Sequence, residues 1–137
     1  MIEQDELAGT IVLVRPDLLN DPANKKNQVG IITSADLEND NLVVSFSDRT
    51  EGLFSSDALL VLRDTAEIRR VADYDFSLLF KEDYCDIMEV CYLARLSAHN
   101  CRRAAVELSQ KNWIAREYTM HPLTDELDLN RCKSVSR

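Results

Sequence analysis

The spacing of the apolar residues changes near Arg63 and divides the chain into two parts. Before Arg63, apolar residues come in short alternating runs interrupted by turn residues, a pattern typical of β-strands. After Arg63, they recur at helical spacing over two long stretches. The pattern predicts an α+β protein in which residues 1–63 form a small β-barrel. Residues 64–137 are predicted to form a helical appendage packed on it, and the two parts to make one composite domain.

Five short strands are predicted before Arg63. The clearest is the third, where Leu42, Val44 and Phe46 alternate with smaller residues and share one face. A long polar loop follows the first strand, and a single helical turn near Ser55 precedes the fifth. This spacing predicts a closed five-stranded barrel. The strands are expected at residues 10–15, 29–33, 42–47, 53–55 and 59–62.

Turn and core positions in this part follow a recognisable order: Gly9, Val12, Val14, Gly30, Ile31, Ile32, Val43, Val44, Phe46, Asp48, Gly52, Phe54, Asp57 and Leu59. That order resembles the SH3-like barrel superfamily, which includes KOW, Tudor and CAP-Gly-type modules. The resemblance covers residues 9–63 only. It implies a barrel that binds through loops and exposed aromatic residues. The long first loop lacks an aromatic cluster, so recognition of proline-rich peptides is not expected.

The first strand is apolar on both faces. Val12 and Val14 are expected inside the barrel, and Ile11 and Leu13 lie on the opposite face. Such a strand must be covered on both sides. The expected cover is the helical part of the chain.

Three helices are predicted after Arg63, over residues 64–72, about 77–98 and about 101–119. A turn at His99-Asn100 favours a hairpin of the last two helices over the alternative of one long rod. Pro122 prevents simple continuation of the helix and begins a polar tail. The core-facing positions of the middle helix are Phe80, Tyr84, Ile87, Met88, Cys91 and Ala94.

The helix at 77–98 is more apolar than one packing face requires. We expect its side nearest Val90 and Leu93 to contact either a second copy of the chain or the tail. In the second case, Leu127 and Leu129 are the contacts. The first case predicts a homodimer through this helix.

Composition and charge narrow the class of protein. The chain has 137 residues, of which 45% are apolar, and its acidic start does not resemble a signal peptide. The four cysteines are expected to be free thiols, with only Cys132 exposed, so a cytoplasmic location is expected. Residues 1–63 carry 11 acidic and five basic residues, and residues 64–137 carry 13 and 11. Because the barrel half is acidic, nucleic acid is not an expected partner.

Catalytic and metal-binding patterns do not stand out. Cys85 and Cys91 would lie about 240° apart round a helix, and zinc ligands are usually more closely paired. The remaining candidates, His99 with Cys101 and Glu117 with His121, are typical of core or helix-end positions. Hydrolase, phosphate-binding and dinucleotide fingerprints are absent from the sequence. We therefore expect no cofactor, no metal and no catalytic residues.

The sequence favours a non-enzymatic protein-interaction or regulatory module, an adaptor or an acidic inhibitor, with another protein as its partner and no membrane. A nucleic-acid-associated small barrel is the first alternative, and an enzyme of unrecognised type is the second. The candidate partner-binding residues are Arg49, Phe54, Val90, Leu93, Trp113 and Arg116.

Overall fold

The computed structural model describes residues 7–18, 24–96 and 98–127. The chain divides into two compact units, and we consider each by itself. The sheet unit comprises residues 1–61 and 122–137, and the helical unit comprises residues 62–121. Among the described residues, no helix is both long enough and apolar enough to cross a membrane.

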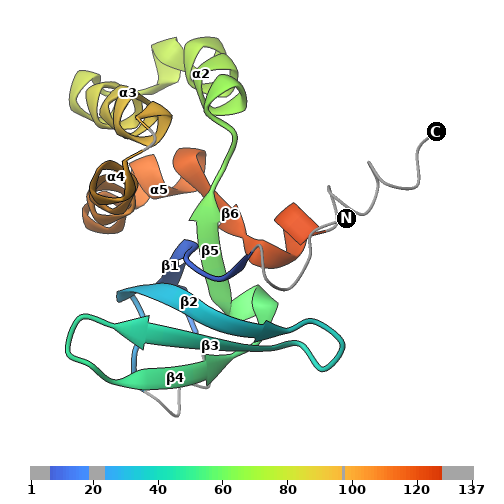
Figure 1. Ribbon diagram of the computed structural model, residues 1–137. Helices are drawn as coiled ribbons and strands as arrows, with labels where there is room; N and C mark the ends of the chain where they lie inside the picture. Colours follow the sequence, from blue (N-terminus) through green and yellow to red (C-terminus); the bar gives the residue numbers. More distant parts are fainter. Residues whose placement is uncertain (1–6, 19–23, 97, 128–137) are drawn as a thin grey trace. The chain divides into compact units, whose positions relative to one another are not determined.

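An antiparallel sheet of six strands makes this an α+β protein (Figure 1). The strand order is β4-β3-β2-β1-β5-β6. The predicted closed barrel is wrong, because the sheet is open. The short strand β6 pairs with the outer edge of β5. In a closed barrel, that edge would have to pair with the strand at the other end of the sheet. The strands are β1 (Ile11–Val14), β2 (Val29–Asp36), β3 (Asn41–Phe46), β4 (Glu51–Phe54), β5 (Leu59–Leu62) and β6 (Met120–Pro122).

The core of the sheet unit follows the predicted alternation. Leu42, Val44 and Phe46 of β3 are buried, and Phe46 meets Phe54 edge to face with ring centroids 6.0 Å apart. All four residues of β1 are buried, as a strand that is apolar on both faces requires. The cover expected from the helical part stays a prediction.

The first part of the predicted tail belongs to the sheet unit. Residues 123–127 are helical, Leu123 is buried in the core of this unit, and Leu127 packs against the same core. The structure therefore places these leucines on the sheet and not on the middle helix. Leu129 lies outside the described residues.

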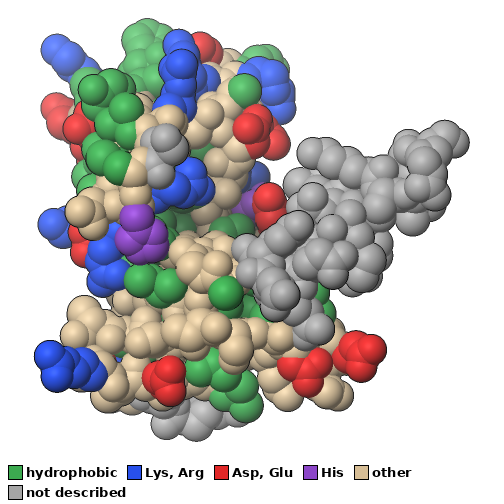
Figure 2. All heavy atoms as spheres, viewed as in Figure 1, with side chains coloured by type: hydrophobic (Ala, Val, Ile, Leu, Met, Phe, Trp, Pro, Cys, Tyr) green, Lys and Arg blue, Asp and Glu red, His purple; other side chains and the backbone are tan. Residues whose placement is uncertain are grey.

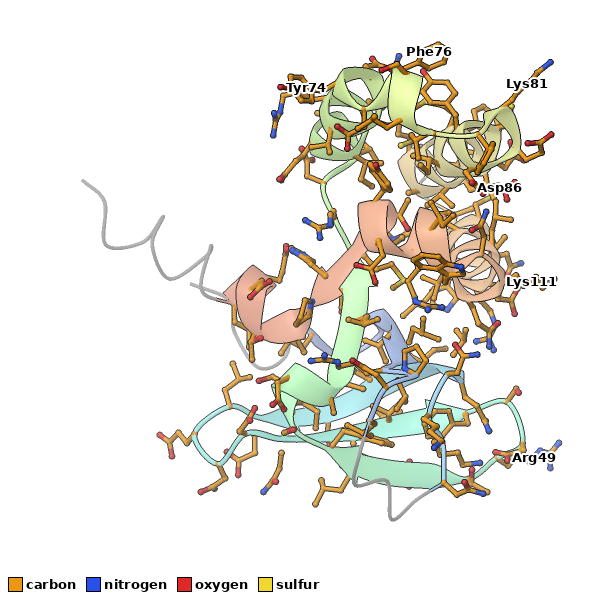
Figure 3. All side chains as sticks on the ribbon, turned by 180° about the vertical axis from the view of Figure 1, so that it is seen from behind. Arg49, Tyr74, Phe76, Lys81, Asp86 and Lys111 are labelled. Atoms are coloured by element: carbon orange, nitrogen blue, oxygen red, sulfur yellow. The ribbon has the colours of Figure 1, made fainter. Side chains whose placement is uncertain are left out.

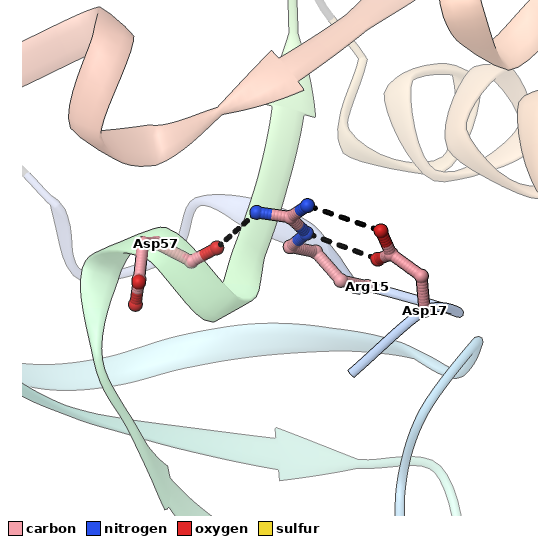
Figure 4. A network of polar contacts seen from close by, with 3 residues as sticks. All are labelled: Arg15, Asp17 and Asp57. Atoms are coloured by element: carbon pink, nitrogen blue, oxygen red, sulfur yellow. Dashed lines mark hydrogen bonds and ion pairs between the residues drawn. The ribbon is translucent and has the colours of Figure 1, made fainter. Parts of the chain in front are cut away.

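Arg15 connects the end of β1 to the 3-10 turn η1 (Ser56–Ala58). Its guanidinium donates two hydrogen bonds of 3.1 Å to the carboxylate of Asp17 and one of 3.2 Å to the carbonyl oxygen of Asp57 (Figure 4). The hydrogen bond with Asp17 raises the pKa of Arg15. These contacts hold η1, the turn that leads into β5, beside the end of β1.

The helical unit contains four α-helices: α2 (Thr65–Tyr74), α3 (Lys81–Arg95), α4 (His99–Lys111) and α5 (Trp113–Thr119), with the 3-10 turn η2 (Phe76–Leu78) between α2 and α3. No strand occurs in residues 80–96, as predicted. The predicted helix at 101–119 is broken at Asn112. The side-chain oxygen of Asn112 accepts hydrogen bonds from the amides of Ile114 and Ala115 and so starts α5.

Most of the apolar excess of α3 is used within its own unit, although Tyr92 is 61% exposed. Ile87 and Cys91 pack with Ile68, Ala72 and Ala115, whereas Val90 and Ala94 pack with Ala105. α3 is therefore apolar on two sides because it lies between two clusters. Val90 is fully buried within its own unit, and contact of this helix with a second copy stays a prediction.

Candidate functional site

Four large apolar side chains are exposed on one short segment of the helical unit. The exposed fractions are 88% for Tyr74, 60% for Phe76, 80% for Leu78 and 75% for Phe80. We call these four residues the apolar ridge. Tyr74 and Phe76 point outward in Figure 3, and Figure 2 shows hydrophobic side chains at the surface of this unit. Single exposed apolar residues are ordinary, but four of them within seven residues make this segment a candidate contact surface.

The backbone of this segment is held by hydrogen bonds along its length. The amide of Asp75 donates to the carbonyl of Val71 at 2.9 Å and closes α2. The amide of Leu78 then donates to the carbonyl of Asp75 at 2.8 Å, within η2. The amide of Tyr84 donates to the carbonyl of Phe80 at 3.0 Å and opens α3. The ridge is thus part of a defined turn between two helices.

Two tyrosines outside the ridge hold the same segment through side chains. The hydroxyl of Tyr84 donates to Oδ1 of Asp73 at 2.7 Å, and the Tyr84 ring meets Phe76 edge to face at 4.8 Å. The hydroxyl of Tyr118 donates to Oδ2 of Asp75 at 2.8 Å. These hydrogen bonds raise the pKa of both phenols. A surface fixed in this way loses little conformational entropy when it binds.

Phe80 is an unusual residue for the N-cap position that it occupies in α3. It is the N-cap of α3, where Ser, Thr, Asp or Asn would satisfy a free amide, and it makes no side-chain cap hydrogen bond. Its ring is also mostly exposed, so it gains little from burial. A residue that serves neither the cap nor the core points to a role outside folding.

The segment that carries the ridge is acidic in composition. Residues 73–86 contain five acidic side chains and one basic side chain, Lys81. None of the five acids forms an ion pair in the part of the chain that the structure describes. The acids are Asp73, Asp75, Glu82, Asp83 and Asp86.

Most of the partner-binding residues predicted from the sequence lie elsewhere. Phe54 is buried in the sheet unit and Val90 in the helical unit, so both contribute to packing and offer no surface. Leu93 is half-buried beside the Val90 cluster. Arg116 is half-buried too, and its guanidinium donates to the carbonyl of Gln110 at 3.4 Å.

Two predicted contact residues are exposed. Trp113 begins α5 with an exposed fraction of 65%. Arg49 points outward from the β3–β4 turn in Figure 3, with a φ of 68°. The members of the predicted set divide between the two units and between core and solvent.

Sequence reasoning missed the ridge because it placed Phe80 on the core-facing side of a helix beginning near residue 77. That placement is wrong, since α3 begins at Lys81 and Phe80 is exposed. The available signal was alternation: Tyr74, Phe76, Leu78 and Phe80 recur every second residue between two helices. Such spacing cannot place all four on the buried face of one helix.

Metal-ligating side chains in the described residues do not gather at one point. There, no group of three or more His, Cys, Asp or Glu side chains is placed to hold a metal ion. An open cavity of about 230 Å³ is lined by Arg63, Glu67, Val71, Glu117 and Tyr118. Its Arg63 already donates to the carbonyl oxygens of Met120 and Glu117, at 3.1 and 3.5 Å.

The three cysteines in the described residues, Cys85, Cys91 and Cys101, are free. Cys91 is buried, and this burial raises the pKa of its thiol, which makes it a poor nucleophile. Comparison with protein-family models, with curated proteins and with solved structures gave no significant match. The apolar ridge is therefore the strongest candidate site on physical grounds.

Proposed function

We propose that this protein is a non-enzymatic protein-interaction module, an adaptor or inhibitor, that docks a partner on the apolar ridge. The observation that carries the proposal is the exposure of four large apolar side chains on a seven-residue segment fixed by Tyr84 and Tyr118. Aromatic anchors on a preorganised surface are the usual source of binding energy at protein interfaces. A reducing, cytoplasmic location belongs to the same proposal, and the free cysteines support it.

Nucleic acid is less well suited to this surface. Aromatic side chains do stack on single-stranded bases, but binding also requires basic groups that follow the phosphates. The segment around the ridge carries five acids and one lysine, and would repel a phosphate backbone. The ridge therefore favours a protein partner.

For residues 9–63, an SH3-like origin is also a proposal. The long loop between β1 and β2, and the 3-10 turn η1 directly before β5, support it. The proposal concerns strand order only, since the sheet is open. Amide-to-amide distances from NMR would test it: pairing of β5 with any strand other than β1 and β6 would contradict the order.

Site-specific photo-crosslinking tests the docking function. p-Benzoylphenylalanine replaces Leu78 on the ridge, and in a matched chain it replaces Leu53, a leucine of β4 that is 59% exposed. After irradiation in native lysate, we expect discrete adducts from position 78 that are absent from position 53. Adding Tyr74→Ser to the first chain should remove them. Identical adducts from both positions, or none from position 78, would contradict the proposal.

A further inference from the structure

We infer that the ridge receives a cationic amphipathic segment of a partner protein, with apolar anchors flanked by lysine or arginine. The inference rests on the proposed function and names the partner's chemistry. Its starting point is the combination of an apolar ridge and an acidic border in one stretch, residues 73–86. Apolar contacts there would supply affinity, and the charges would select the partner and its orientation.

Four of the five acids of the border are held in place by hydrogen bonds from side chains. Asp73 and Asp75 accept hydrogen bonds from the phenols of Tyr84 and Tyr118. The amide of Asn112 donates to Asp83 at 3.0 Å and to Asp86 at 2.8 Å. All these donors are uncharged, so these contacts fix the positions of the side chains without forming an ion pair. Fixed carboxylates that form no ion pair among the described residues suit the ammonium or guanidinium groups of a partner.

The helix ends add to the same preference. α2 ends at Tyr74 with no basic residue in its last turn, so its free carbonyl groups leave partial negative charge beside the ridge. α3 begins at Lys81 with Glu82 and Asp83 in its first turn, and these acids offset the positive end of that helix. The C-terminal end of α2 therefore favours a cation, and the N-terminal end of α3 does not oppose one.

Charge also decides against the other occupants. A symmetric contact between two copies would bring the same five carboxylates face to face and would be repulsive. An anionic membrane surface would be repelled by the same groups. A separate basic segment avoids both difficulties.

Fluorescence anisotropy with two labelled peptides tests the inference on the full chain. Both peptides have leucines at i, i+3, i+4 and i+7 helical spacing; one carries lysine at the polar positions and the other glutamate. We expect the lysine peptide to bind at least about tenfold more tightly than the glutamate peptide, with affinity falling as salt rises. Leu78→Ser should weaken the lysine peptide, because it removes an anchor while leaving the charges unchanged.

A pair of charge-matched variants separates local from overall charge. Asp73→Asn with Glu82→Gln removes two exposed acids from the border, and should weaken the lysine peptide by about threefold to tenfold. Glu38→Gln with Glu51→Gln removes two exposed acids from the sheet unit and should leave binding unchanged. Equal effects of the two variants would show unspecific attraction and overturn the inference.

The outcomes also separate this inference from the proposed function. The lysine peptide should displace the adduct formed from position 78, whereas the glutamate peptide should not. If that adduct forms and neither peptide displaces it, the docking function stands and the cationic partner is wrong. If no adduct forms and neither peptide binds, both are wrong.

A synthetic peptide of residues 128–137, which carries Arg131, Lys133 and Arg137, serves as a competitor. If it displaced the lysine peptide at equal concentration, the chain's own C-terminal segment would be the occupant, and the inference would be overturned.

Discussion

The hydroxyl of Tyr118 on α5 donates a 2.8 Å hydrogen bond to Asp75, the residue that caps the C-terminus of α2. The two residues are 43 positions apart in sequence, so the start of the apolar ridge is fixed by the far end of the helical unit. Leu79, inside the ridge segment, packs against the core that contains Ile68 and Ala115. The exposed side chains thus alternate with Asp75 and Leu79, whose contacts hold the segment in place.

Asp75→Asn should lower the pKa of Tyr118, because the hydrogen bond to the carboxylate is the main cause of its raised value. A raised pKa means that folding favours the protonated phenol. Its contribution to stability is therefore complete below the ordinary tyrosine pKa of about 10 and is lost as pH rises through the folded value. Ultraviolet titration of phenolate checks this shift. Tyr118→Phe is the control, since it should remove the same titration step from the spectrum.

Asp48→Asn should reduce the acid sensitivity of the sheet unit. The ammonium of Lys25 donates to Asp48 at 2.7 Å, and this contact, together with hydrogen bonds from Thr50, holds the pKa of the carboxyl well below its ordinary value. A depressed pKa stabilises the fold above the unfolded value, near pH 4, and the contribution is lost as pH falls towards the folded value.

The measurement is the urea midpoint between about pH 6 and pH 2. Wild type should lose stability below about pH 4 more steeply than Asp48→Asn. Glu38→Gln, which removes an exposed acid from the same unit, should retain the wild-type slope. If Asp48→Asn also retained that slope, the ion pair with Lys25 would contribute nothing in solution.

Gly30→Ala should destabilise the sheet unit. A Cβ atom at Gly30 would lie 2.5 Å from Cγ1 of Val44 and 3.0 Å from the ring of Phe46, both of which are buried. Overpacking of this kind costs about 1–3 kcal/mol. Denaturant unfolding measures the loss, and Ser34→Ala at an exposed position of the same strand is the control. A loss equal to that of the control would mean that β2 and β3 separate easily at this point.

Local periodicity predicted the features that depend on neighbours in sequence. The alternation of Leu42, Val44 and Phe46 is such a feature, and their burial is confirmed. The open sheet was not predictable in this way, because β6 has three residues and pairs with β5 from 58 or more positions away in sequence. A strand that short has no periodic pattern of its own. The break at Asn112 does carry an N-cap signal, but apolar spacing continues across it and favoured one helix.

Predicting the site from the sequence would have required even more knowledge of the tertiary structure. Apolar character alone suggests burial, and for this reason the sequence places Phe80 in the core. Trp113 is predicted to be an anchor because Trp is common at interface hot spots. Exposure of Phe80 follows from the place where α3 begins, and that place is set by contacts of Leu79 and Tyr84 with the helices around them. Helix boundaries are the least certain part of sequence interpretation, and here the boundary determines the site.

Phe80→Ser should separate stability from function, because it changes both in opposite directions. Serine at the N-cap of α3 would accept a hydrogen bond from a first-turn amide that Phe80 leaves without a side-chain cap. Little burial is lost, since the ring is 75% exposed, so we expect the free energy of unfolding to rise by about 1 kcal/mol. The same substitution removes an aromatic anchor and should lower the yield of the adduct formed from position 78.

Ala98→Ser is the matched control: it gives α4 an N-cap of the same kind at an exposed position outside the ridge. It should give a similar gain in stability, measured by urea unfolding, with no loss of adduct. If Phe80→Ser lowered stability by more than about 1 kcal/mol, the ring would be a packing residue, and its exposure would no longer support a docking role.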